Sequence, residues 1–457
     1  MSAVGEIRSV VARIRPALGD GSSLLIVSHF LQLLLRVGSS MIVTRLLSPE
    51  AYGVIGIVSS VSFILVMISD MGLRAYIIRH EHGGDELMQS VWTVRLMRNM
   101  VIFSIMFVGA GVFADMYKAP EIATAIRICA FPFIIEAFSS LAYQTTERNR
   151  GVVRLTVLEF IRFLLVTITT IVAAFILRSY WAIIVAMFVN AFFSFFSSYF
   201  LLKGPPVRFR LDPAHIRDLW GFWRIIIPSS VITLILTQTN TVVMARYFPL
   251  EELGKFTIAT TLSAAVVTVS GEYVIRVFFP RFAEANRKGA ELAKDMYYAA
   301  RRPVTLFFAF GIGGLIGGGE LLVRILYNSE YLGAGFYLSL LCLAPLVRLS
   351  SLPAEQAIIT KGFVKVALVS NAVRLAWIAV AGPVAYLNFG PMALIIVFCL
   401  SEAAAAPYFL WKLKQYDLLN LREEFFIIVA MLIGAAIGYG CFASIEAMIA
   451  AGTLPDF

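Results

Sequence analysis

Apolar stretches of nearly uniform length occupy almost the whole chain. A helix needs about 20 consecutive apolar residues to cross the hydrocarbon of a bilayer, and thirteen such stretches follow one another with short links between them. The 457 residues are 59% hydrophobic and 15% charged, whereas soluble domains carry about 25% charged residues. The sequence therefore predicts an all-α polytopic membrane protein.

The boundaries of the apolar stretches predict two sets of six helices and one further helix. We expect helices at 23–46, 51–73, 90–114, 122–144, 152–177 and 180–201, then at 221–247, 254–278, 302–327, 333–352, 364–387 and 390–411, and a last one at 425–451. The expected domains are a six-helix bundle at 23–202, a linker at 203–220, a second six-helix bundle at 221–412 and the additional helix at 425–451. Residues 1–22 have the apolar and basic alternation of an amphipathic segment on the membrane surface, not of a cleavable signal.

Basic residues concentrate in the N-terminal tail and in every second loop after it. Cytoplasmic loops of membrane proteins carry such an excess of Lys and Arg. This distribution accounts for the net charge of +9, so we expect no nucleic-acid partner. It predicts a cytoplasmic N terminus and a C terminus on the opposite side of the membrane.

The two halves repeat a short pattern at a constant spacing. Arg45, Glu50 and Gly53 recur as Arg246, Glu251 and Gly254, and 246 − 45, 251 − 50 and 254 − 53 all equal 201. A spacing of six helices preserves orientation, so we expect a parallel repeat about an axis along the membrane normal. Transporters with such repeats hold their substrate at the interface of the halves.

Polar side chains form a stripe along the first predicted helix. They are spaced so that they share one helical face around a central arginine, and they are His29, Gln32, Arg36 and Ser40. An arginine inside a membrane marks a functional site by default, and its planar guanidinium suits an anionic group. The alternative is a buried tie between neighbouring helices.

A comparable face on the seventh predicted helix carries hydroxyl and amide residues. It consists of Ser229, Thr233, Thr237 and Asn240. Such groups often only join neighbouring helices, but their register with the Arg36 stripe makes them substrate-binding candidates. Arg348 and Arg374 are further candidates in the second half, unless they snorkel to the membrane surface.

Two carboxylate–arginine pairs with a spacing of four residues end corresponding helices of the two halves. They are Asp70 with Arg74 and Glu272 with Arg276. Ion pairs at this spacing commonly stabilise a single helix. The alternative is a gate, in which the carboxylate changes partners or takes up a coupling proton. We also expect Glu159 and Arg162 to neutralise each other.

Signatures of enzymes and metal sites do not occur. The chain has no Walker, HExxH or GxSxG sequence, and its four cysteines lack a metal-binding spacing. The run Gly311 to Gly317 follows no strand and predicts close helix packing. We therefore expect neither an enzyme nor a cofactor or metal.

Three motifs in the first half resemble those of bacterial polysaccharide-export flippases. They are RLLSPEAYGV from Arg45 to Val54, DMGL from Asp70 to Leu73 and SVWTVR from Ser90 to Arg95. This family shares a superfamily with lipid II flippases and multidrug and toxin extrusion carriers. The motifs cover residues 36–162 only, whereas the helix pattern is similar over nearly the whole chain. A thirteenth helix departs from the family's usual even number.

The resemblance implies translocation of an undecaprenyl-diphosphate-linked oligosaccharide by alternating access of two bundles. The implied location is the bacterial inner membrane, with a periplasmic C terminus. Translocation would serve the synthesis of a cell-surface polysaccharide, which is O-antigen, capsule or exopolysaccharide. The implied partners are this lipid-linked oligosaccharide, membrane lipid, a coupling proton or sodium ion, and a polysaccharide biosynthesis complex.

Two other functions remain open. A cation or drug antiporter of the same superfamily calls for a carboxylate-rich cavity, yet the first helix carries Arg36 at its centre. A membrane-embedded polysaccharide polymerase or ligase calls for a sizeable external loop, and the loops here are short.

Overall fold

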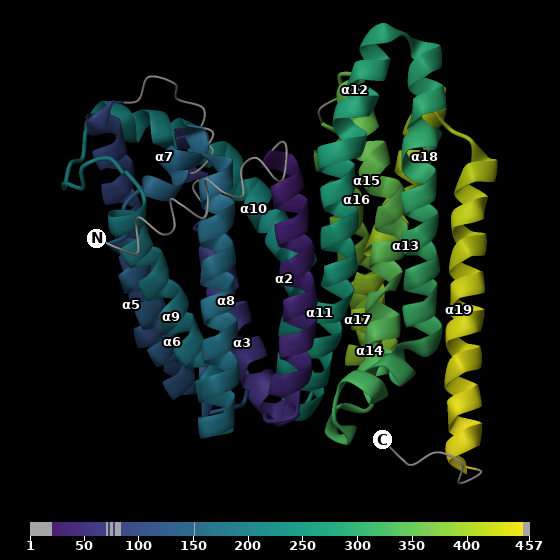
Figure 1. The fold of residues 1–457 in the computed structure, drawn as a ribbon, viewed down its shortest axis with the longest axis horizontal. Coiled ribbons are helices and arrows are strands. Elements are labelled where there is room, and N and C mark those ends of the chain that lie inside the picture. The colour runs from purple at the N-terminus through teal and green to yellow at the C-terminus, as the bar shows by residue number, and fades with distance from the viewer. Residues whose placement is uncertain are drawn as a thin grey trace. The chain divides into compact units, whose positions relative to one another are not determined.

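The computed structural model describes residues 21–69, 72–73, 76–77, 84–149, 151–363 and 365–450. Within these ranges all regular structure is helical (Figure 1). The chain divides into two compact units, with the boundary between Leu234 and Ile235. We describe each unit by itself. The expected amphipathic segment at 1–22 lies almost entirely outside the described residues.

The first unit contains seven helices and most of an eighth within its described part. They are α2 (Gly21–Thr44), α3 (Pro49–Ile68), α5 (Asp85–Met116), α6 (Ile122–Ala137), α7 (Ala142–Arg148), α8 (Val152–Leu177), α9 (Trp181–Phe196), extended by the π-helical turn η1 (Ser197–Leu201), and α10 (Pro213–Tyr247), which crosses into the second unit.

The helix expected at 122–144 is two helices, α6 and α7, which meet at an angle of 54°. The break exposes the carbonyl of Ser139, which accepts hydrogen bonds from Trp92 Nε1 at 3.0 Å and from the guanidinium of Arg95. A carbonyl inside a continuous helix is already bonded to the helix itself. The bend therefore creates an acceptor that α5 uses.

The segment expected as a linker at 203–220 is helical in its second half, because α10 begins at Pro213. Proline favours the first turn of a helix, where its fixed φ fits and its missing N–H is not needed. Leu219 and Trp223 are buried against α5, in a cluster that includes Trp92. Burial of this apolar face stabilises the helix, although the segment carries several charged residues.

The second unit contains the remaining helices of the described chain. They are α11 (Leu250–Tyr273), the π-helical turn η2 (Val274–Phe278), α12 (Phe279–Lys288), α13 (Ala290–Leu326), the 3₁₀ turn η3 (Ser329–Tyr331), α14 (Ala334–Leu341), α15 (Leu343–Thr360), α16 (Val366–Phe389), α17 (Pro391–Cys399), α18 (Ser401–Gln415) and α19 (Leu421–Ala450).

The prediction of a basic loop between residues 278 and 302 is wrong, because α12 and the start of α13 occupy these residues. The two helices meet at Gly289, and Phe282 and Tyr297 pack together with Phe278. Ala, Glu, Lys and Arg dominate this segment and are good helix formers. The polarity of this segment predicted a loop, whereas a polar segment can also be helical.

Ten helices of the described residues are long and apolar enough to cross a membrane, or eleven if the bent pair α6 and α7 counts as one span. Each of the thirteen expected stretches nevertheless coincides with one helix or with consecutive helices. The fold is that of an all-α polytopic membrane protein, as the composition predicted.

Glycines allow α13 and α19 to pack closely, and Figure 1 shows α19 lying along α13. A Cβ atom on Gly313 or Gly317 would overlap backbone atoms of Met431 or Ala435, and one on Gly434 would overlap the carbonyl of Phe310. The predicted role of the Gly311 to Gly317 run in helix packing is thus confirmed. Its partner is α19.

The starts of α3 and α11 have matching positions in the two halves. They lie at Pro49 and Leu250, and 250 − 49 is again 201. The preceding residues, Ser48 and Pro249, have similar extended conformations, with ψ of 161° and 157°. The parallel repeat of two six-helix bundles remains a prediction.

Candidate functional site

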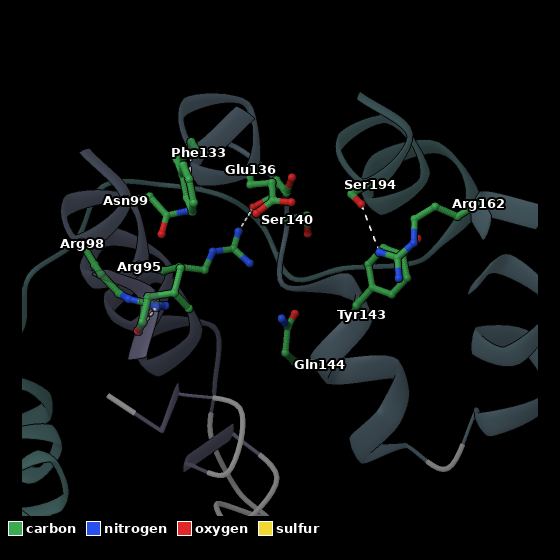
Figure 2. A pocket seen from close by; sticks show the side chains of 12 residues that line it. Arg95, Arg98, Asn99, Phe133, Glu136, Ser140, Tyr143, Gln144, Arg162 and Ser194 are labelled. Carbon is green, nitrogen blue, oxygen red and sulfur yellow. Dashed lines mark hydrogen bonds between the residues drawn. The ribbon is translucent and has the colours of Figure 1, made fainter. Parts of the chain in front are cut away.

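A cavity of about 340 Å³ in the first unit brings together four charged side chains from three helices. Figure 2 shows these side chains. Arg95 and Arg98 come from α5, Glu136 from α6 and Arg162 from α8. Three guanidinium groups and one carboxylate leave a formal charge of +2 in the lining. A charge within a membrane bundle is costly and calls for a partner or a function.

Hydrogen bonds to uncharged groups hold two of these arginines in place. Arg95 donates to the carbonyl of Ser139 at the break between α6 and α7. Arg162 donates from Nη1 to Ser194 Oγ on α9 at 3.3 Å. The expected pair of Arg162 with Glu159 is therefore not the contact that orients Arg162. Neither acceptor is a carboxylate, so neither bond cancels the positive charge.

The third arginine connects α5 to the end of α3. Arg98 donates from Nε to Ser69 Oγ and from Nη2 to the carbonyl of Val66, both at 3.0 Å. This contact holds the Arg98 side chain at the wall of the cavity, beside Asn99 (Figure 2).

Several buried polar atoms of the lining have no hydrogen-bond partner in the described part of the chain. They are Arg95 Nε, Ser139 Oγ, Ser140 Oγ and Gln144 Oε1. Buried polar groups in proteins are almost always hydrogen-bonded to protein or to ordered solvent. Their grouping around one cavity indicates that the cavity holds polar contents.

The stripe expected on the first helix lies on α2, where only part of it can be described. Arg36 is exposed, and its guanidinium lies 5.9 Å from the centre of the Phe163 ring on α8. Gln32 donates to Ser28 Oγ at 3.2 Å, and Ser40 is half-buried. The side chain of His29 lies outside the described residues. None of these residues lines the cavity.

The second stripe lies on α10, where the boundary between the units falls. Thr233 belongs to the first unit, and Thr237 and Asn240 belong to the second. Thr237 is exposed, and the other two are half-buried. The Ser229 side chain lies outside the described residues. A common site with Arg36 remains a prediction.

The two candidate arginines of the second unit are both paired with carboxylates. Nη2 of Arg374 on α16 lies 2.6 Å from Oε2 of Glu402 on α18. Nη1 of Arg348 lies 3.4 Å from Oε2 of Glu355, and both residues are on α15. The charges of this group balance. The cavity of the first unit differs in this respect, because its positive charge is in excess.

Of the two proposed gate pairs, one can be described. Arg276 on η2 forms an ion pair with Glu272 on α11, as its spacing predicted. Asp70 and Arg74 lie outside the described residues.

Arg95 and Arg98 were not among the site residues predicted from the sequence. A signal for them existed, because both lie well inside the apolar span of α5 and three residues apart, on one helical face. What the sequence could not show is that Glu136 and Arg162, from two other helices, share their cavity.

The fold defines the class of this protein as a polytopic all-helical membrane protein. Its structure is similar to that of lipid II flippase MurJ in an inward closed conformation, with a TM-score of 0.65 and 15% identity, covering 93% of this chain and 98% of the other. It is also similar to an inward-facing multidrug resistance MATE family transporter of the MOP superfamily, with a TM-score of 0.60 and 14% identity over 84% and 94% of the two chains.

The family model described as polysaccharide biosynthesis protein matches residues 42–336. The chain belongs to this family, and the resemblance seen in the sequence is confirmed. It is 24% identical over 303 residues to the succinoglycan biosynthesis transport protein ExoT of Rhizobium meliloti (strain 1021), covering 66% of this chain and 61% of that protein. It is 20% identical over 337 residues to the lipopolysaccharide biosynthesis protein WzxC of Escherichia coli (strain K12), covering 72% and 67%.

Proposed function

We propose that the chain is a flippase that moves a polyprenyl-diphosphate-linked oligosaccharide across the bacterial inner membrane, for the synthesis of a cell-surface polysaccharide. The observation that carries this proposal is family membership over residues 42–336. Relatives named for succinoglycan transport and lipopolysaccharide biosynthesis support it. The N terminus is cytoplasmic, the C terminus periplasmic, and transport runs from the cytoplasmic to the periplasmic leaflet.

The chemistry of the substrate agrees with the charges of the chain. A diphosphate needs cationic donors, which guanidinium groups supply best, while the lipid tail stays in the bilayer. Two six-helix bundles, related by the parallel repeat, alternate between access from either side. In this proposal Arg36, Gln32, His29 and Ser40 contact the head group in transit, together with Thr233, Thr237 and Asn240.

A cation or drug antiporter fits less well. Its cargo would meet the excess positive charge around Glu136 in the first unit. A polymerase or ligase is also disfavoured, because the described connections after residue 85 are short and leave no room for a catalytic domain.

Reconstitution tests the proposal directly. The purified chain is placed in liposomes that carry a fluorescent lipid-linked oligosaccharide in both leaflets, and an added glycosidase reports the fraction exposed outside. We expect the protein to make the inner pool accessible, with a pH or sodium gradient changing the rate. An inner pool that stays protected, together with normal surface polysaccharide in a deletion strain, would contradict the proposal.

A further inference from the structure

We propose that the cavity lined by Arg95, Arg98, Glu136 and Arg162 is a diphosphate-binding site that takes the head group of the lipid-linked substrate. The site lies wholly inside the first unit. The identity of its lipid-linked ligand rests on the proposed function, whereas anion binding does not.

The charge of the lining selects an anion. Arg95 and Arg162 donate to neutral groups, and Glu136 is the one carboxylate in the lining, so an anionic ligand would neutralise the remaining positive charge. Charge-assisted hydrogen bonds from guanidinium groups to phosphate oxygens are among the strongest in proteins. They gain further strength where surrounding apolar helices lower the local dielectric constant.

Free hydrogen-bonding capacity lies beside these charges. Arg95 Nε, Ser139 Oγ and Ser140 Oγ are donors without an acceptor in the described residues. The acceptors that Arg95 and Arg162 do use are a neutral carbonyl and a neutral hydroxyl. A phosphate group supplies several acceptor oxygens, which is what this set of donors lacks.

The size and position of the cavity suit a head group and not a glycan. Its volume of about 340 Å³ lies at the low end of small-molecule sites, so it has room for a diphosphate but not for an oligosaccharide. Arg95 on α5 and Arg162 on α8 both line this cavity, so the two side chains face a common space.

A purely structural role for these arginines gives a different expectation. If they serve only to neutralise Glu136, the unchanged chain binds no diphosphate, even though Glu136→Gln would free their charges. If they form an anion site, the unchanged chain already binds diphosphate, and Glu136→Gln removes a repelling carboxylate and increases affinity. Binding by the unchanged chain separates the two roles, and its absence would overturn the site.

The experiment measures binding to the full chain, purified into nanodiscs of zwitterionic phosphatidylcholine, by calorimetric titration. The probes are inorganic diphosphate, geranyl diphosphate and geraniol. Arg95→Gln and Arg162→Gln each remove one charge, and Arg162→Lys keeps the charge but loses the planar fork. Arg178→Gln is the matched control, because Arg178 is exposed at the other end of the helix that carries Arg162.

We expect inorganic diphosphate and geranyl diphosphate to compete for one site that geraniol does not occupy. Each Arg→Gln variant should weaken binding about tenfold or more, as expected for a lost charge-assisted hydrogen bond. Glu136→Gln should tighten binding severalfold, and Arg178→Gln should leave it unchanged. The Glu136→Gln result remains informative even if an arginine variant does not fold.

Equal diphosphate binding by Arg95→Gln, Arg162→Gln and the unchanged chain would overturn the site, as would weaker binding by Glu136→Gln. Binding of inorganic diphosphate without competition from geranyl diphosphate would overturn the lipid-linked head group as ligand. If these variants bind weakly but flip the oligosaccharide normally in liposomes, the inference fails and the proposed function stands. If they bind as expected and the unchanged chain does not flip, the proposed function fails alone.

Discussion

Arg301 on α13 lies against Glu424 at the start of α19 and donates a hydrogen bond to its carboxylate. The side chain of Arg301 is 2% exposed and that of Glu424 is 14% exposed. Tyr298 and Ser350 donate to the same carboxylate at 3.1 and 2.8 Å. Glu424 thus binds α19 to α13 and to α15, and the thirteenth helix is an integral part of the second unit.

Removal of this carboxylate should destabilise the protein strongly. Glu424→Ala leaves the buried guanidinium of Arg301 without its charged partner, which costs about 3–5 kcal/mol. The measurement is thermal denaturation of the detergent-purified protein, followed by size-exclusion chromatography. Lys294→Ala is the control, because it breaks an exposed pair with Asp417 that contributes about 0–1 kcal/mol. Equal melting temperatures for the two variants would argue against the anchoring role.

The close approach of α13 and α19 should tolerate no side chain at Gly434. A methyl group there meets the carbonyl of Phe310, whereas one at Gly440 on the same helix meets nothing within 4 Å. We expect Gly434→Ala to lose about 1–3 kcal/mol of stability, as overpacked sites do. Gly440→Ala should be neutral or slightly stabilising, because alanine favours helix. The same denaturation assay reports both, and a neutral Gly434→Ala would disprove the tight contact.

Arg36 should be needed for transport and not for folding, because its side chain is exposed. Arg36→Ala is expected to abolish surface polysaccharide in a complementation assay while the protein remains in the membrane at normal levels. Arg36→Lys should restore activity only in part, since an ammonium group lacks the planar fork. Full activity of Arg36→Ala would remove this residue from the substrate path.

The pair of Glu272 and Arg276 should affect the conformational equilibrium more than stability. Its side chains are 41% and 34% exposed, and exposed pairs contribute about 0–1 kcal/mol. Such an energy shifts a two-state equilibrium severalfold. We expect Glu272→Gln with Asp70→Asn to express normally, transport differently and change the reactivity of engineered cysteines toward cytoplasmic reagents. Unchanged cysteine reactivity and unchanged transport in the double variant would show that neither carboxylate is part of a gate.

Helices that cross the membrane could be predicted closely, and those outside it could not. The expected helix at 425–451 corresponds to α19 at Leu421–Ala450, because a long apolar run has only one stable state in lipid. The expected loop between 278 and 302 is helical instead. Polar residues there are compatible with loop or helix, and the packing of Phe278, Phe282 and Tyr297 selects the helix.

The sequence was sufficient to identify a helical membrane protein and to indicate its polysaccharide biosynthesis family, because apolar length, charge distribution and motifs are properties of contiguous residues. It also marked Arg36 and the Glu272–Arg276 pair as candidates through helical spacing. The three-dimensional fold was needed to show that Arg95 and Arg162, 67 residues apart by 162 − 95, line one cavity with Glu136. It was also needed to show that Arg374 pairs with Glu402. Within a helix, the spacing of residues fixes which face they share. Contacts between helices depend on how each helix is rotated and bent against its neighbours. The bend between α6 and α7, which frees the Ser139 carbonyl for Arg95, is an example.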